Sequence, residues 1–148
     1  MIAPDANLLI YAYDRESPFH IASRKWWDGL LSSPEPIGIP VYCLLAFVRF
    51  VTNPRIAPNP LSFAQAAAIM DSWLSLPQVL LLNPGDRHWV LLRGLSEQLR
   101  LSGVQVTDAA IAAIAIEYGA VIHTNDRDFA RFPGLRWVNP LDGPSRVR

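Results

Sequence analysis

The feature that most constrains the fold of this chain is the alternation of short apolar segments with longer segments of helical pattern. The apolar runs cover residues 1–4, 37–41, 78–82, 120–123 and 135–138. They are nearly continuous in apolar character, as expected for strands that are buried on both faces of a sheet. Parallel strands need helical crossovers between them. We therefore predict an α/β fold, a three-layer α/β/α sandwich with a mostly parallel sheet.

The helices are predicted from the spacing of apolar residues and from residues that begin or end helices. Ser62 and Asp86 are predicted to cap helices at their amino ends, and Gly119 is predicted to end one. Helices are expected directly after Asp5 and over residues 17–31, 44–51, 64–74, 87–101 and 107–118.

Length and composition limit the organisation of the chain. Its 148 residues predict one domain over residues 1–141, with residues 142–148 as a flexible tail. Its apolar segments fall short of the roughly 18 to 20 residues that a membrane span needs, and the first residues carry no basic leader. A single cysteine, Cys43, cannot form an internal disulfide. We therefore expect a cytoplasmic protein without a membrane segment.

Four aspartates follow predicted strands or begin a predicted helix. Asp5 follows the first strand, Asp126 and Asp128 follow the strand at 120–123, and Asp108 begins a helix. Ligands of open parallel sheets bind beyond the carboxyl ends of the strands, so these side chains are expected to meet there. Clustered carboxylates without a nearby lysine repel one another unless a cation lies between them. Oxygen ligands favour Mg²⁺ or Mn²⁺.

Each of these aspartates also has a structural interpretation. An acid in the first turn of a helix, as predicted for Asp108, stabilises the helix dipole. Asp126 and Asp128 lie in a segment rich in turn-forming residues. Taken singly, the two interpretations are equally good. The metal site is predicted from the set of four.

Four blocks of sequence, in this order, carry a resemblance to a known family. They are DANLLIYA at residues 5–12, FVRFVTNP at 47–54, VTDAAIA at 106–112 and TNDRDF at 124–129. Together they resemble the VapC-type PIN-domain ribonucleases, the toxins of bacterial toxin-antitoxin pairs. The agreement in order and spacing spans nearly the whole chain.

The resemblance implies a Mg²⁺-dependent endoribonuclease, with Mn²⁺ as a possible substitute, that cuts single-stranded RNA with a metal-activated water. It also implies a cognate antitoxin as partner and a homodimer. It implies Asp5, Asp108 and Asp126 as metal ligands, Asp128 as a further catalytic residue, and Asn7 and Thr124 as supporting residues. The candidates for contact with RNA phosphates are Arg15, Arg49, Arg127 and Arg131. Such contacts must be local, because thirteen basic and thirteen acidic residues leave no net charge.

One acid of the family pattern is missing. PIN domains usually carry a glutamate in the helix after the second strand, whereas residues 42–47 here are YCLLAF. Glu117 is a remote substitute, because it lies about 14 Å along its helix from Asp108; a solvated helix face is the other interpretation. The departure leaves open a weak or inactive PIN domain that acts by binding RNA or antitoxin.

Other reactive residues are expected to play no catalytic part. His20, His88 and His123 share no metal-ligand spacing, and Cys43 lies among apolar residues as an inert thiol. An aspartyl phosphotransfer domain is a further alternative. It needs an activating lysine, and Lys25, the only lysine, falls in an early helix.

Overall fold

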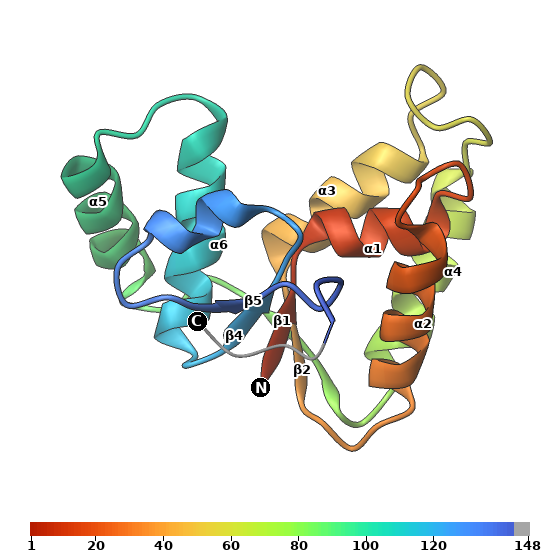
Figure 1. Cartoon of the computed structure of the whole chain (residues 1–148), viewed down its shortest axis with the longest axis horizontal. Coiled ribbons are helices and arrows are strands. Elements are labelled where there is room, and N and C mark those ends of the chain that lie inside the picture. Colours follow the sequence, from red (N-terminus) through yellow and green to blue (C-terminus); the bar gives the residue numbers. More distant parts are fainter. Residues whose placement is uncertain (144–148) are drawn as a thin grey trace.

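A computed structural model of the chain describes residues 1–143 and has the predicted α/β architecture (Figure 1). The strands are β1 (Ile2–Pro4), β2 (Ile37–Pro40), β3 (Val79–Leu82), β4 (Val121–His123) and β5 (Arg136–Val138). The helices are α1 (Ala6–Tyr13), α2 (His20–Leu31), α3 (Val41–Val51), α4 (Phe63–Leu74), α5 (His88–Leu99), α6 (Val104–Glu117) and a short 3-10 helix, η1 (Arg127–Arg131).

Within these residues the strands form one five-stranded sheet in the order β3-β2-β1-β4-β5, with every pairing parallel. The chain moves outward from β1 to β3 and then returns to the other side of β1 with β4. The strand order therefore reverses between β1 and β4. In sheets of this kind the crevice for ligands opens at such a reversal, beyond the carboxyl ends of the two strands.

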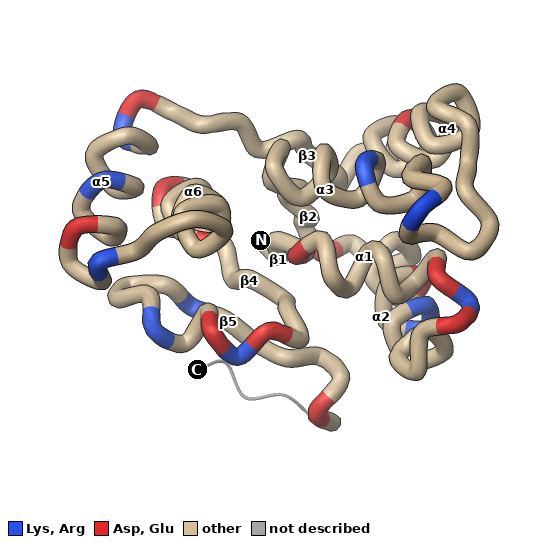
Figure 2. Tube along the Cα trace, turned by 90° about the horizontal axis from the view of Figure 1, so that it is seen from above, with Lys and Arg blue, Asp and Glu red and all other residues tan. Residues whose placement is uncertain are grey.

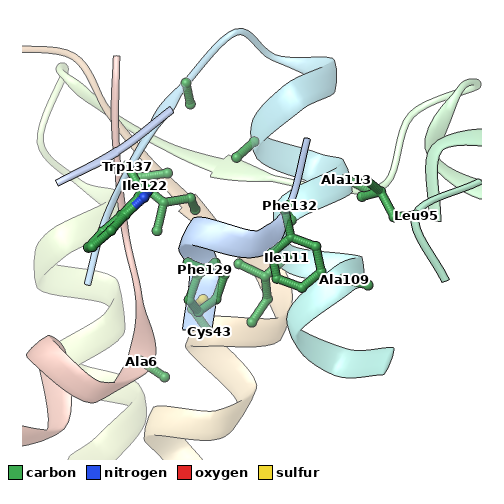
Figure 3. Close-up of a cluster of buried hydrophobic side chains, with 14 residues drawn as sticks. Ala6, Cys43, Leu95, Ala109, Ile111, Ala113, Ile122, Phe129, Phe132 and Trp137 are labelled. Atoms are coloured by element: carbon green, nitrogen blue, oxygen red, sulfur yellow. The ribbon is translucent and has the colours of Figure 1, made fainter. Parts of the chain in front are cut away.

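Two buried clusters of apolar side chains cover the two faces of the sheet. Figure 1 shows α5 and α6 on one side and α1, α2 and α4 on the other. The first cluster joins the alanine-rich face of α6 to β1, β4 and η1, and Figure 3 shows Phe129 and Phe132 beside Ile111. The second is aromatic, with the Trp27 and Trp73 ring centroids 5.1 Å apart. Ala6, which follows β1, and Phe129, which follows β4, belong to the first cluster, so both segments are anchored in a packed core.

Helix starts explain where the sequence prediction was right and where it was wrong. Ser62 and Gln65 form a reciprocal capping box at α4, as the position of Ser62 predicts. Asp86 does not cap α5, which begins after Arg87 without a side-chain cap from its own segment. Instead, the carboxylate of Glu117 accepts hydrogen bonds from the backbone N–H groups of Gly85 and Arg87, at 3.0 and 2.8 Å. An acid from α6 therefore takes the place that was predicted for Asp86.

The start of α6 changes the expected setting of Asp108. Gly103 has a φ of +57°, which glycine adopts readily, and α6 begins at Val104 rather than at Thr107. Asp108 consequently lies in the second turn of α6 and not at its terminus. The first turn of α6 contains no acid, so the helix-dipole interpretation of Asp108 was wrong.

The predicted tail begins at Asp142, whose carboxylate lies 3.6 Å from the guanidinium of Arg127. Residues 144–148 of that tail lie outside the described residues. Among the helices of residues 1–143, we find none with the length and apolar character to cross a membrane.

Candidate active site

Asp5 is held at the point where β1 passes into α1. It is 7% exposed and caps α1, with Oδ1 accepting the backbone N–H of Ala6 at 2.7 Å. Its own backbone N–H donates to the carbonyl of His123 at 2.9 Å, which continues the pairing of β1 with β4. The backbone thus fixes this carboxylate at the reversal of the sheet.

Thr124 connects the ends of β1 and β4. Its buried hydroxyl donates to Oδ2 of Asp5 at 2.7 Å and accepts the side-chain amide of Asn7 and the backbone N–H of Asp126, each at 2.9 Å. The hydroxyl has a single proton, so these two accepted hydrogen bonds direct that proton to Asp5. Asn7 and Thr124 thus form a hydrogen-bonded chain that ends at the Asp5 carboxylate, and their supporting part in the site stays a prediction.

The loop after β4 is ordered by short polar contacts. Asp126 accepts the backbone N–H of Asp128 at 2.8 Å and so caps η1. The side chain of Asn139, which follows β5, donates to Oδ1 of Asn125 at 3.0 Å. The turn interpretation of Asp126 therefore holds, and it is compatible with a place in the acid cluster because one oxygen makes the cap. Asn139 was missed, although a polar residue directly after a strand was the signal that drew attention to Asp5.

Asp108 approaches the cluster from α6. Its carboxylate lies 3.9 Å from the guanidinium of Arg131, and both side chains are partly exposed. Figure 2 shows the acidic positions in red at the start of α1, on α6 and on the segment before β5. The charges of Asp108 and Asp126 both act on Asp5, so carboxylates from three separate parts of the chain lie near one another.

The pKa shifts of Asp5 and Asp108 show that the carboxylates of the cluster interact electrostatically. Burial, together with the charges of Asp108 and Asp126, raises the pKa of Asp5 from 3.8 to about 6, against the lowering effect of the hydrogen bonds from Thr124 and Ala6. Burial and the charges of Asp126 and Asp128 also raise the pKa of Asp108, while Arg131 lowers it. A bound cation would offset the repulsion between these carboxylates.

The carboxylate oxygens of the site are ligands that suit a hard divalent cation, although they do not form a complete coordination shell. Within residues 1–143, no three His, Cys, Asp or Glu side chains surround one point at metal-ligand spacing. Mg²⁺ does not require such a cage, since it keeps several waters and is commonly held by one or two carboxylates and substrate phosphates. Asp5, Asp108 and Asp126 are the residues that would hold it here.

The helix after β2 turns a thiol, not an acid, toward Asp5. The Sγ atom of Cys43 lies 3.9 Å from Oδ1 of Asp5, and Cys43 is fully buried. Burial and the charge of Asp5 raise the pKa of this thiol well above its ordinary value, so it stays protonated and unreactive. Glu117 does not replace the missing acid, because it holds the loop before α5 from the far end of α6.

The four candidate arginines fall into two groups. Arg131 lies at the acid cluster, and Arg127 is an exposed residue of the same short helix. Arg15 follows the end of α1 opposite to Asp5 and lines a cavity of about 340 Å³. Arg49 lies in the last turn of α3, next to Phe50 of that cavity wall. The structure therefore brings Arg131 to the acids but not Arg15 or Arg49, and the cavity is separate from the acid cluster.

The three histidines make contacts with aromatic rings or with the backbone. The ring of His123 stacks on Trp26 with centroids 5.8 Å apart, and burial lowers its pKa to about 4. His20 contacts the carbonyl of Tyr11 at 2.9 Å, and His88 is buried beside the ring of Tyr42.

Comparison with known proteins identifies this arrangement. The family of the PIN domain matches residues 2–135. The chain belongs to this family. Ribonuclease VapC33 of Mycobacterium tuberculosis is 41% identical over 141 residues, which cover 95% of this chain and 99% of the relative. The VapC ribonuclease Mb2897 of Mycobacterium bovis is 37% identical over 147 residues, 99% of this chain and 100% of the relative. The resemblance to VapC-type PIN-domain ribonucleases is confirmed, and with it the class of enzyme, a nuclease.

Solved structures agree on the fold. VapBC2 from Rickettsia felis, bound to a DNA fragment from its promoter, has a TM-score of 0.66 at 21% identity and covers 93% of this chain and 97% of that chain. VapC20 of Mycobacterium tuberculosis, a toxin that cleaves the sarcin-ricin loop, has a TM-score of 0.65 at 18% identity, with 91% and 98% covered. At these identities the likeness shows the PIN-domain fold alone.

Proposed function

We propose that this chain is a divalent-metal-dependent endoribonuclease, the toxin of a toxin-antitoxin pair, and that it cuts single-stranded RNA in the cytoplasm. The observation that carries the proposal is the convergence of Asp5, Asp108 and Asp126 at the reversal of the sheet, where their mutual repulsion calls for a cation. Mg²⁺ fits this set of oxygen ligands, and Mn²⁺ has the same ligand preference.

When bound, the metal would polarise the scissile phosphate and activate a water. The chain's own residues do the rest. Thr124 and the N–H of Ala6 fix the direction of the Asp5 carboxylate, so its charge is aimed before substrate arrives. Asp126 and Asp128 add negative charge at the rim from the loop after β4, and Asp128 is the catalytic helper that the family resemblance implies.

The test is cleavage of single-stranded RNA by the purified chain with Mg²⁺, with Mn²⁺ and with EDTA. Asp5→Asn and Asp108→Asn keep side-chain size and remove the charge. Asp71→Asn, on the exposed face of α4, is the matched control. We expect discrete fragments that require metal, disappear in both site variants and persist in the control. Metal-independent cleavage, or full cleavage by Asp5→Asn, would contradict the proposal.

The alternatives make different predictions. A catalytically inactive PIN domain binds RNA or antitoxin without cutting, and Cys43 at the position facing Asp5 is the observation in its favour. RNA binding without any metal-dependent product would select it. The phosphotransfer reading has lost support, because Lys25 lies on the exposed surface of α2.

The antitoxin and the oligomeric state belong to the same proposal. A toxin-antitoxin complex from Klebsiella pneumoniae is among the structural neighbours, which supports a cognate antitoxin for this chain. Expression should arrest growth, and Asp5→Asn should relieve the arrest.

Exposed apolar side chains on the edge strand β3 and on α5 support a homodimer; they include Leu80, Leu81, Trp89 and Val90. A monomeric mass in light scattering at micromolar concentration would refute the dimer.

A further inference from the structure

Arg131 is a cation placed among the acids of the candidate site. Its Nη2 atom lies 3.9 Å from Oδ2 of Asp108, and 28% of its side chain is exposed. This contact is an ion pair and is too long for a hydrogen bond. The guanidinium therefore offsets the charge of Asp108 without making close contact with it.

Aromatic side chains pack around Arg131. Phe129 and Phe132 come from the same turn of chain and are almost fully buried, with ring centroids 5.7 Å apart. Figure 3 shows both rings in the cluster under α6. The Arg131 guanidinium lies over the ring of Phe132, 5.3 Å from its centroid. Stacking on the ring face directs the edge of the guanidinium, with its N–H donors, away from the ring.

Those donors are not satisfied. The Nε and Nη2 atoms of Arg131 are buried, and neither donates a hydrogen bond within residues 1–143. Buried donors without acceptors are destabilising by roughly 1 to 3 kcal/mol. An anion that brought its oxygens into hydrogen-bond distance would be a better partner for this guanidinium than Asp108 is.

We propose that Arg131 is a two-position counter-ion that couples metal binding to substrate binding. Without metal it neutralises Asp108 and competes with a divalent cation for that carboxylate. With metal on the acids, the guanidinium turns its edge to a phosphate oxygen of the RNA. The inference rests on the proposed function, and it adds that one residue opposes metal binding and favours RNA binding.

The first measurement is Mn²⁺ binding by calorimetry in the absence of RNA. Removing a positive charge next to a divalent-cation site should tighten binding about tenfold for Arg131→Ala. Arg131→Met, which keeps the apolar stem over Phe132, should do the same. Arg131→Lys keeps the charge and should bind like the wild type. Arg93→Ala is the matched control, since Arg93 is exposed on α5 and pairs with Glu97 instead.

The second measurement is RNA cleavage at saturating Mn²⁺. Loss of a charge-assisted hydrogen bond to phosphate should raise KM for Arg131→Ala about tenfold, with partial rescue in Arg131→Lys. The two effects have opposite signs, tighter metal and weaker RNA. A residue with a merely structural role would weaken both when replaced.

The outcomes separate this inference from the proposed function. If the wild type binds Mn²⁺ and cleaves RNA while both charge-free variants bind Mn²⁺ equally well or more weakly, the coupling is wrong and the nuclease proposal stands. Joint loss of metal and RNA affinity that lysine does not rescue would also overturn it. If neither the wild type nor the charge-free variants bind metal, both proposals fail.

Discussion

Asp5 and Asp108 face the same candidate site but are held in opposite ways. Asp5 is 7% exposed and accepts short hydrogen bonds from the Ala6 backbone and the Thr124 hydroxyl. Asp108 is more open, and its carboxylate has a guanidinium 3.9 Å away. One carboxylate is fixed by the sheet and its loops, while the other is balanced by the charge of a neighbouring side chain.

The difference follows from where each residue lies in the fold. Asp5 stands at the junction of a central strand and a helix, where backbone groups on both sides have few alternative positions. Asp108 projects from the second turn of a helix, so only its side chain meets the cluster. A site with one fixed and one adjustable acid can hold a metal and still respond to substrate.

The largest effect is expected from Asp5→Asn. It keeps the shape of the side chain but removes a charge that the fold has aimed in advance, so cleavage should fall roughly a thousandfold. Cleavage by Asp108→Asn should fall less, because the carboxylate of Asp108 projects from a helix and is partly exposed, so it is aimed less strictly in advance than that of Asp5. Single-turnover cleavage of one RNA at saturating Mn²⁺ compares the two. An equal loss in both variants would break the distinction between fixed and adjustable acids.

The same substitution should stabilise the metal-free protein at neutral pH. A carboxyl with its pKa raised to about 6 binds more protons when folded than when unfolded between about pH 4 and 6, so its contribution to stability falls as pH rises through that window. The deficit at pH 7 is about 3 kcal/mol. His123, with its pKa lowered to about 4, has the opposite trend over about pH 4 to 6.5.

The prediction therefore concerns the difference in unfolding free energy between the wild type and Asp5→Asn, in which the contribution of His123 cancels. Urea unfolding in EDTA should show that the stability of Asp5→Asn, relative to that of the wild type, rises steadily from pH 4 to pH 7. A gap that is constant with pH would show that the Asp5 carboxyl is not desolvated as its burial requires.

Thr124→Val should have the next largest effect. It removes the donor to Asp5 and leaves Asn7 and the Asp126 backbone N–H without their shared acceptor. Replacing a residue that hydrogen-bonds to a metal ligand typically lowers metal affinity or activity by about 10- to 100-fold. Thr124→Ser keeps the hydroxyl and should retain most activity. If the serine variant loses as much metal affinity in calorimetry as the valine variant, the hydroxyl hydrogen bonds do not explain the role of Thr124.

Much of the fold could be predicted from sequence because strands and helix starts depend on patterns of neighbouring residues. The apolar runs and the Ser62 cap correspond to strands and to the start of α4, since both depend on neighbouring residues. The predictions were wrong where a local feature depends on residues that are distant in sequence. Asp86 is a good capping residue, yet Glu117, 31 positions further along, supplies the acceptor for the N–H groups before α5.

The site divides in the same way. That Asp5 and Asp126 would meet follows from the parallel sheet, because both come directly after strands. The contacts of Cys43 and Arg131 with the acids could not be predicted, since they depend on how α3 and η1 rotate when Phe129 and its neighbours pack. Side-chain direction is set by packing between elements that are distant in sequence.

The smallest effect is expected at Glu117, the acid at the far end of the helix that carries Asp108. Its carboxylate lies at the start of α5, where negative charge interacts favourably with unpaired backbone N–H groups. Glu117→Gln should therefore lower the free energy of unfolding by about 1 kcal/mol, measured by urea denaturation, and leave the Mn²⁺ affinity and the cleavage rate unchanged. Glu117 would then contribute to stability alone, whereas Asp108, on the same helix, contributes to metal binding and cleavage. A loss of metal affinity in Glu117→Gln, at unchanged stability, would instead return Glu117 to the site as the substitute for the missing glutamate.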